Sequence, residues 1–175
     1  PADGFSNTTY TISGTNGSCN DITTIELNAL TCYGFNANDM ILRGNATISG
    51  GDVTLTTASG YQFGALWSTD RLDLTKYFRV KSQLYFGNDD AGADGLAFVI
   101  QPLSSNEGSA GGGIGYAGIN PSIAIEFDTY FNSPGDPYSN DHMAIMNNGN
   151  TSNHTNAIDL GNIEDNNWHD FEVSW

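Results

Sequence analysis

Short segments of alternating apolar and polar residues follow one another along most of the chain. Gly and Asn interrupt these segments at intervals of roughly ten residues, a spacing typical of strands joined by turns. The clearest segment is 78–86 (FRVKSQLYF), in which Phe78, Val80, Leu84 and Phe86 share one parity. Alternate side chains of a strand point to opposite faces, so this pattern predicts a strand with one apolar face. Similar patterns predict strands within residues 39–49, 51–57, 64–68, 96–101, 122–127, 142–146, 157–159 and 171–175.

The composition agrees with this pattern. Hydrophobic residues make up 38% of the chain and charged residues only 14%, so its polarity rests on Asn, Ser, Thr and Gly. These residues are typical of strands and turns rather than of exposed helices. A chain of 175 residues is long enough for one domain with a sizeable core. We therefore predict a single all-β domain built as a sandwich of antiparallel sheets.

The two ends of the chain differ from this regular pattern. Residues 1–38 are rich in turn-forming residues, and we predict an irregular N-terminal segment there. Cys19 and Cys32 lie in it without a CxxC motif or a histidine cluster, which favours one disulfide and an oxidising, extracellular or cell-surface location over two free thiols. The chain stops inside the alternating segment 171–175, so we expect a sandwich truncated at its C-terminus, with the remainder lost or supplied by another chain.

The charge balance excludes several classes of partner. The formal net charge is −15, from twenty acidic and five basic side chains. Nucleic-acid binding requires clustered Lys and Arg, so we expect no nucleic acid. No apolar run approaches the ~18 residues that cross a membrane, so we expect no membrane insertion. Most of the acidic excess keeps an extracellular protein soluble, and part of it is available to bind cations.

Residues 123–146 concentrate the groups that bind metal ions. Strand parity places Glu126 and Asp128 together on the face opposite Phe127. Two carboxylates on one strand face repel unless a positive charge lies between them, and no Lys or Arg occurs from residue 82 to the end. The alternative is an acidic, solvated loop with a surface histidine. Oxygens for calcium are available from Asp128, the Tyr130 carbonyl, Asn132 and Asp136, and ligands for manganese or zinc from Glu126, Asp128, Asp136 and His142.

Two further motifs are compatible with sugar binding. Asp94 directly precedes the apolar segment 96–101, where its carboxylate can accept hydrogen bonds from vicinal hydroxyls or serve as an ordinary turn residue. Residues 111–118 (GGGIGYAG) form a glycine-rich loop, which permits close approach of the backbone to a ligand. This loop lacks the Lys-Ser/Thr of a phosphate-binding loop.

Together, residues 93–98 (ADGLAF), 111–118 and 123–132 (IAIEFDTYFN) resemble the L-type, or legume, lectin family in order and spacing. The resemblance covers residues 39–175. It implies a concanavalin-like jelly-roll β-sandwich that binds carbohydrate with the help of Ca²⁺ and Mn²⁺ or another transition metal. The motifs match the transition-metal ligands of the family at Glu126, Asp128, Asp136 and His142, and its calcium ligands at Asp128, Tyr130, Asn132 and Asp136.

The resemblance also implies the sugar-binding residues. Asp94 matches the sugar-binding aspartate, whose preceding peptide bond, here after Ala93, is usually cis in the family. Tyr130 matches the aromatic residue that stacks on sugar, and Asn132 contacts both sugar and calcium. Gly115 best matches the glycine that donates its backbone N–H, with Gly113 as the alternative. Asp141 directly precedes His142 and competes with Asp136 for the bridging position.

Two other functions remain possible from the sequence. Glycoside hydrolases of the laminarinase type share the concanavalin-like fold and use a Glu-x-Asp-x-x-Glu strand. Here Glu126 and Asp128 fit the start of that motif, but Tyr130 and Phe131 stand where the second glutamate belongs. Hydrolysis then lacks its acid–base pair, so we expect no enzyme. A structural adhesin domain that binds metals but no sugar is the third reading.

Overall fold

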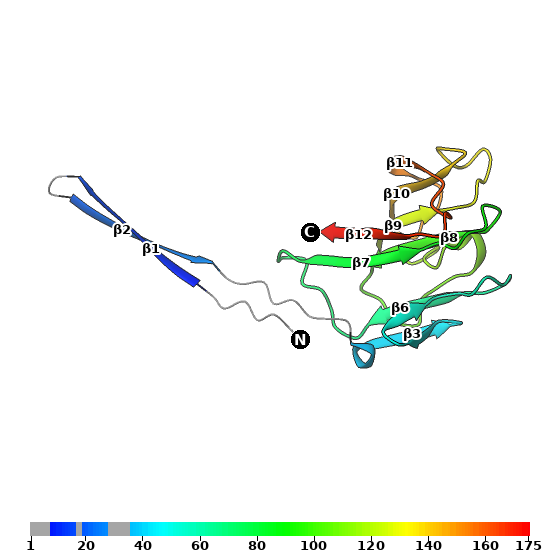
Figure 1. The fold of residues 1–175 in the computed structure, drawn as a ribbon, viewed down its shortest axis with the longest axis horizontal. Coiled ribbons are helices and arrows are strands. Elements are labelled where there is room, and N and C mark those ends of the chain that lie inside the picture. The colour runs from blue at the N-terminus through cyan, green and yellow to red at the C-terminus, as the bar shows by residue number, and fades with distance from the viewer. Residues whose placement is uncertain (1–7, 17–18, 28–35) are drawn as a thin grey trace. The chain divides into compact units, whose positions relative to one another are not determined.

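The computed structural model describes residues 8–16, 19–27 and 36–175, which form two compact units, Pro1–Asn36 and Ala37–Trp175 (Figure 1). In the first unit, β1 (Thr8–Asn16) and β2 (Cys19–Leu27) pair as an antiparallel hairpin. This hairpin differs from the irregular segment expected there, because Thr and Ile recur along both strands and favour extended backbone. Cys32 and the side chain of Cys19 lie outside the described residues, so their disulfide stays a prediction.

The second unit consists of short strands joined by turns. The expected strands are all present, and the last two begin two to three residues earlier than expected. The elements are η1 (Ala37–Asp39), β3 (Met40–Gly44), β4 (Thr47–Ser49), β5 (Asp52–Thr54), β6 (Gly64–Ser68), β7 (Arg79–Tyr85), β8 (Gly95–Ile100), η2 (Gly111–Gly113), β9 (Ile123–Asp128), β10 (Asp141–Asn147), β11 (Thr155–Gly161) and β12 (Trp168–Ser174).

Antiparallel pairing runs through the second unit. Its largest sheet has the strand order β11-β10-β9-β8, and the remaining strands pair as β12-β7, β3-β6 and β4-β5. All these pairs are antiparallel, which confirms the predicted all-β class. In the part of the chain that the structure describes, no helix is long and apolar enough to span a membrane.

Aromatic side chains join the largest sheet to the β12-β7 pair. Phe171 of β12 packs against Phe98 and Phe127, with ring centroids 5.6 and 5.8 Å apart. Phe86, just after β7, packs against Phe127 at 5.8 Å. These contacts between the two sheets form one apolar layer of the sandwich.

The opposite face of the largest sheet is covered as well. Ala124 of β9 and Met146 of β10 are buried there beneath a loop that carries Ile114, Tyr116 and Ile119. Both faces of β9 are therefore shielded from water. The face that bears acidic residues is buried rather than solvated, which the alternating pattern alone does not reveal.

The C-terminal strand is paired along its whole length. β12 pairs with β7 from the Trp168–Tyr85 to the Ser174–Arg79 positions. Beyond it, the Trp175 N–H donates to the Phe78 carbonyl at 3.0 Å. Whether another chain completes the sandwich stays a prediction.

Candidate functional site

The candidate site begins on the even-numbered positions of β9 and β10. Asp128 lies directly opposite His142 in the antiparallel register, and Glu126 lies opposite Ala144. On the other side of β9, Glu126 is opposite Ala97 of β8. Because both directly opposite residues are alanines, they leave space beside the Glu126 carboxylate. The parity argument thus places two carboxylates and an imidazole on one face.

Five side chains converge at this face from four segments: β9, the loop after it, β10 and the residue before β11. Two overlapping sets each have ligand atoms within 4.8 Å of one another. The sets are Glu126, His142 and His154, and Asp128, Asp136 and His142. Glu126 and His142 are each 1% exposed and Asp128 is 5% exposed, so the groups are withdrawn from water.

Glu126 is held on one side only. Its Oε2 accepts a hydrogen bond from the Tyr116 hydroxyl. Its Oε1 is buried and has no hydrogen-bond donor among the described residues. Burial is the main cause that raises the pKa of Glu126 to about 7; the hydrogen bond from Tyr116 opposes this shift, and the charges of Asp128 and Asp136 add to it. Burial of a carboxylate oxygen without a hydrogen-bond donor is unfavourable, and a bound cation would offset that free-energy cost.

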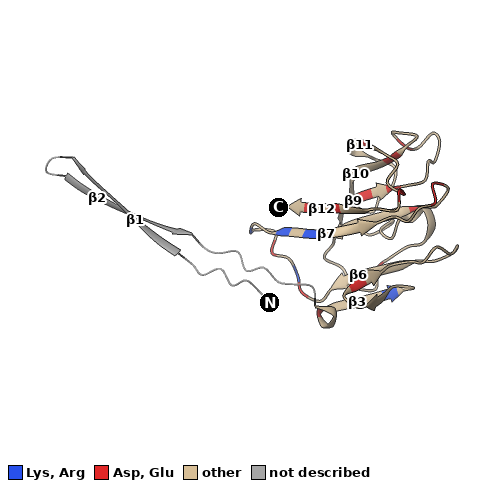
Figure 2. Cartoon of the chain, viewed as in Figure 1, with Lys and Arg blue, Asp and Glu red and all other residues tan. Residues whose placement is uncertain are grey.

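The electrostatics of the neighbouring carboxylate are similar. Burial is the main cause that raises the pKa of Asp128 to about 6, although its Oδ1 accepts the Tyr130 N–H at 2.8 Å. Figure 2 shows Lys and Arg on β3, on β7 and in the segment between β6 and β7, and none on β8 to β12. No Lys or Arg lies on β9 or β10 to balance these acids, so a bound cation fits the donor set.

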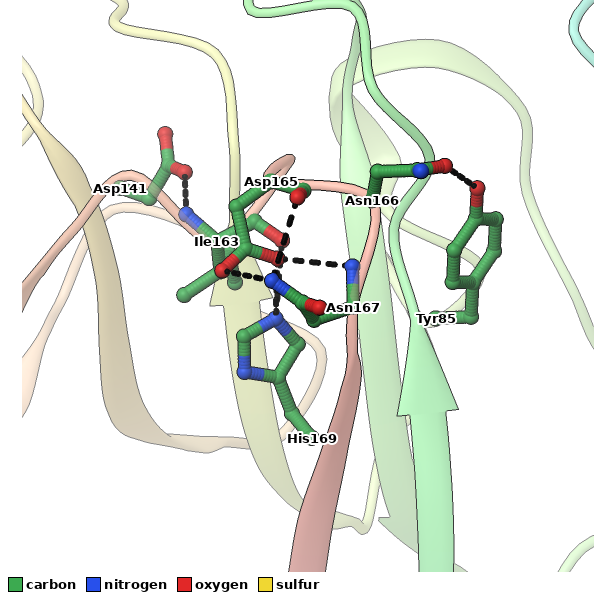
Figure 3. Close-up of polar contacts among 7 residues, drawn as sticks. All are labelled: Tyr85, Asp141, Ile163, Asp165, Asn166, Asn167 and His169. Atoms are coloured by element: carbon green, nitrogen blue, oxygen red, sulfur yellow. Dashed lines mark hydrogen bonds and ion pairs between the residues drawn. The ribbon is translucent and has the colours of Figure 1, made fainter.

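The two competing aspartates have different surroundings. Asp136 reaches the ligand group from the loop after β9, where its carboxylate accepts the Asn132 N–H. Asp141 instead accepts the Ile163 N–H at 2.7 Å through Oδ2 (Figure 3). The loop around Ile163 is fixed in turn by His169, whose Nε2 lies 3.1 Å from both the Ile163 carbonyl and Asp165 Oδ1. The geometry therefore brings Asp136, and not Asp141, to Asp128 and His142.

Tyr130 and Asn132 lie on the exposed loop between these ligands. Both side chains are exposed, Tyr130 by 47%. Phe131, which lies between them, is 46% exposed. An exposed aromatic ring beside polar groups can stack on the C–H surface of a sugar.

Asp94 and the glycine-rich loop lie close together. The Ala93–Asp94 peptide bond is cis, as the resemblance implied. The Asp94 carbonyl accepts the Thr129 N–H at 3.1 Å, which places Asp94 beside the end of β9. A Cβ atom added to Gly111 or Gly112 would lie 3.9 Å from an Asp94 carboxylate oxygen. The structure thus brings together the Asp94 carboxylate, the glycine-rich loop and the start of the loop that follows β9.

The glycine assignments differ in their hydrogen bonding. Gly115 already donates its backbone N–H to the Ser109 carbonyl at 3.1 Å. The Gly113 carbonyl accepts the N–H groups of Tyr116 and Ala117, both at 2.9 Å. Sequence reasoning did not single out Gly111 or Gly112, because the first glycines of a loop carry no signal that tells them apart.

His154 is the site residue that the sequence analysis missed. It directly precedes β11, and its side chain is 6% exposed. Its Nε2 lies 3.5 Å from Glu126 Oε1 and 4.0 Å from Asp136 Oδ1. Burial, followed by the nearby His142, lowers the pKa of His154, and the charge of Asp136 opposes this shift. One signal was available: the chain has only three histidines, and two of them flank adjacent predicted strands.

Comparison with known proteins yields one family. A model of the legume lectin beta-barrel domain family matches residues 32–175. The lectin alpha chain of Lablab purpureus is 32% identical over 151 residues, which are 74% of this chain and 53% of that protein. The serine-rich adhesin for platelets of Staphylococcus aureus (strain MRSA252) is 33% identical over 101 residues, 54% of this chain and 8% of that protein. The pesticidal crystal protein Cry22Aa of Bacillus thuringiensis is 37% identical over 84 residues, 47% of this chain and 12% of that protein.

A solved structure has the same fold. The crystal structure of basic winged bean lectin with Tn-antigen superposes with a TM-score of 0.66 at 21% sequence identity. The match covers 80% of this chain and 65% of the winged bean chain. The predicted jelly-roll β-sandwich is confirmed. The chain spans about half the length of the Lablab relative and smaller shares of the other two.

Proposed function

Because this chain belongs to the legume lectin β-barrel domain family, we propose that it binds glycans through a site supported by a calcium ion and a transition-metal ion. The observation that carries this proposal is the buried group of carboxylates and imidazoles beside Asp94 and the glycine-rich loop. Such a group is costly to bury without a cation. The sugar is bound at the surface next to this group, by Asp94, Tyr130 and Asn132.

The two ions divide the donor set by chemistry. The transition-metal ion, Mn²⁺ or another first-row ion, takes an imidazole together with carboxylates. Calcium takes oxygens only. The transition-metal ligands are Glu126, Asp128, Asp136 and His142, and the calcium ligands are Asp128, Asp136, the Asn132 side chain and the Tyr130 carbonyl. Calcium contributes by holding the loop of Tyr130 and Asn132 in its binding conformation before the sugar arrives.

The sugar contacts follow from the exposed groups around this loop. The Asp94 carboxylate accepts hydrogen bonds from two sugar hydroxyls, and Asn132 adds a further hydrogen bond through its amide. The Tyr130 ring stacks on the apolar side of the sugar. A backbone N–H of the glycine-rich loop completes the set: Gly113 or Gly115 by family position, and Gly111 or Gly112 by proximity to Asp94.

We propose binding without catalysis. Counted from Glu126, the exposed Phe131 occupies the position where a laminarinase-type strand carries its second glutamate, and the preceding residue, Tyr130, is not acidic either. The two carboxylates on β9, Glu126 and Asp128, are buried among metal-ligand groups. They are therefore poorly placed to flank a glycosidic bond.

We also propose that the chain belongs to a secreted or cell-surface protein. The similarity to a bacterial adhesin supports this location, as does the Cys19–Cys32 pair in the sequence. In this proposal, residues 39–175 form the lectin module, residues 1–38 a separate segment, and another chain can complete the sandwich. The division of the chain after Asn36 supports the separate segment.

A glycan array probed with and without EDTA tests the function. The protein in Ca²⁺ and Mn²⁺ should bind a defined subset of glycans, and EDTA should abolish that binding without unfolding the protein. Binding that persists in EDTA would contradict the role of the metals. Elemental analysis that finds no metal in protein never exposed to a chelator would contradict it as well.

A further inference from the structure

Three buried atoms of the candidate site that could bind a metal ion have no hydrogen-bond partner among the described residues. Across the described residues, four buried side-chain oxygen or nitrogen atoms have no hydrogen-bond partner. Three of them, Glu126 Oε1, His142 Nε2 and His154 Nε2, belong to one group whose ligand atoms lie within 4.8 Å. Native proteins rarely leave buried polar atoms unpaired, so their convergence on one point indicates a missing partner.

The orientation of the His142 and His154 rings indicates the chemical nature of the missing partner. His142 Nδ1 lies 3.4 Å from the Asn140 carbonyl, so the tautomer with its proton on Nδ1 donates there and leaves a lone pair on Nε2. The His154 ring lies at 60° to the His142 ring, with centroids 5.3 Å apart. His154 Nε2 and Glu126 Oε1 lie 3.5 Å apart without forming a hydrogen bond. With the proton of His154 on Nδ1 as well, both nitrogens and the carboxylate oxygen are acceptors, which do not satisfy one another. They match a metal ion.

We propose that His154 is a direct second imidazole ligand of the transition-metal ion, and that it makes the site selective for the zinc class of ions (Zn²⁺, Co²⁺, Ni²⁺) over Mn²⁺. This inference rests on the metal-dependent glycan binding proposed above, and it assigns a ligand and a metal preference that the four-residue set does not contain. Imidazole nitrogen suits zinc and nickel, whereas an oxygen-rich set suits manganese. Replacement of a water or oxygen ligand by nitrogen therefore shifts the preference toward zinc.

Direct coordination is tested by X-ray absorption at the zinc edge. The whole chain is stripped with EDTA and reloaded with Zn²⁺ at saturating Ca²⁺. We expect two imidazole ligands in the wild type and one in His154→Gln. A single imidazole in the wild type would overturn the inference.

Selectivity is tested by competition of Zn²⁺ and Mn²⁺ with a chromophoric chelator. Because zinc binds more tightly than manganese at most nitrogen-containing sites, the informative quantity is the change in the affinity ratio between variants. His154→Gln should lower zinc affinity by at least about tenfold, the lower end of the loss measured when residues that support metal ligands are mutated. It should lower manganese affinity much less. His154→Asp, which retains a ligand but replaces nitrogen by oxygen, should move the ratio further toward manganese.

His169→Gln is the matched control, because His169 binds the Asp165 loop outside the metal group. It should leave the affinity ratio unchanged. An unchanged ratio in both His154 variants would refute the selectivity. If zinc binds through one imidazole and EDTA still abolishes glycan binding, only this inference fails. If neither ion binds the wild type, the metal dependence of the proposed function fails with it.

Discussion

Glu164 offers a test of the buried electrostatics that is independent of the metal ligands. It follows β11, is 7% exposed, and its Oε2 has no hydrogen-bond partner in the described part of the chain. A Cβ added to Gly92 would lie 2.4 Å from Glu164 Oε1, so the carboxyl group is tightly packed. Burial is the main cause that raises its pKa from 4.5 to about 7, followed by the charges of Asp141, Asp90 and Asp89.

The sign of the pH dependence follows from this raised pKa. The folded protein holds the Glu164 proton more tightly than the unfolded chain does. Its contribution to stability is therefore fully present below about pH 4.5 and is lost as the pH rises through 7. Each pKa unit corresponds to about 1.4 kcal/mol, so the wild type should lose on the order of 3 kcal/mol of unfolding free energy through this group.

The perturbation is Glu164→Gln, which keeps the shape of the protonated side chain and cannot ionise. Urea unfolding in EDTA should give stabilities within about 1 kcal/mol of each other for variant and wild type at pH 5. At pH 8 the variant should be more stable, by up to about 3 kcal/mol. Buried acids that do not interact with Glu164 titrate equally in both proteins and cancel in the difference.

Glu172→Gln is the control, because Glu172 is exposed and its hydrogen bond with Lys81 lowers its pKa. A lowered pKa contributes stability above its unfolded value and loses it as the pH falls. The control should therefore change stability slightly and in the opposite direction at pH 8. If the unfolding free energies of Glu164→Gln and wild type differ by the same amount at pH 5 and at pH 8, the raised pKa of Glu164 is refuted.

Two other substitutions test the framework of the site. Gly95→Ala should destabilise the protein by about 3 kcal/mol or more, because the position has φ +136 and an added Cβ would lie 2.1 Å from the Phe127 carbonyl oxygen. Thermal melts should show this loss, with Gly60→Ala, whose Cβ meets nothing within 4 Å, as the neutral control. Asn132→Ala should weaken both calcium and glycan binding by about tenfold or more, because each loses one charge-assisted hydrogen bond or one ligand. Calcium affinity and glycan affinity measured by calorimetry should fall together, and a loss of only one would contradict the double role of Asn132.

The strands were predictable from local pattern. Alternation identified the strands of the second unit, and its parity correctly placed Glu126 and Asp128 opposite Phe127, because both properties depend only on neighbours along one strand. The hairpin of β1 and β2 was not predicted, because segment 1–38 contains many turn-forming residues as well as the recurrent Thr and Ile that favour strands.

The site residues that depend on loops were not predictable in the same way. The sequence assigned Asp136 as the ligand but left Asp141 as a competitor. The two differ in the structure because the Ile163 N–H, 22 residues further along the chain, donates to Asp141. His154 lies at the end of a loop of Asn, Gly, Thr and Ser, so its approach to Glu126 depends on the conformation of that loop and on β10-β11 pairing. Contacts between distant segments carry no local periodicity.

Titration calorimetry of Asp94→Ala against a glycan identified by the array tests the central proposal most directly. The Asp94 carbonyl accepts the Thr129 N–H next to the end of β9, but Asp94 belongs to neither group of proposed metal ligands, so sugar and metal binding can be separated at this residue. The variant, loaded with Ca²⁺ and the transition metal, should retain wild-type metal content by elemental analysis. Its glycan binding should fall below detection, because each buried charge-assisted hydrogen bond contributes about 1.5–3 kcal/mol. Wild-type glycan affinity in Asp94→Ala would place the sugar site elsewhere and contradict the account.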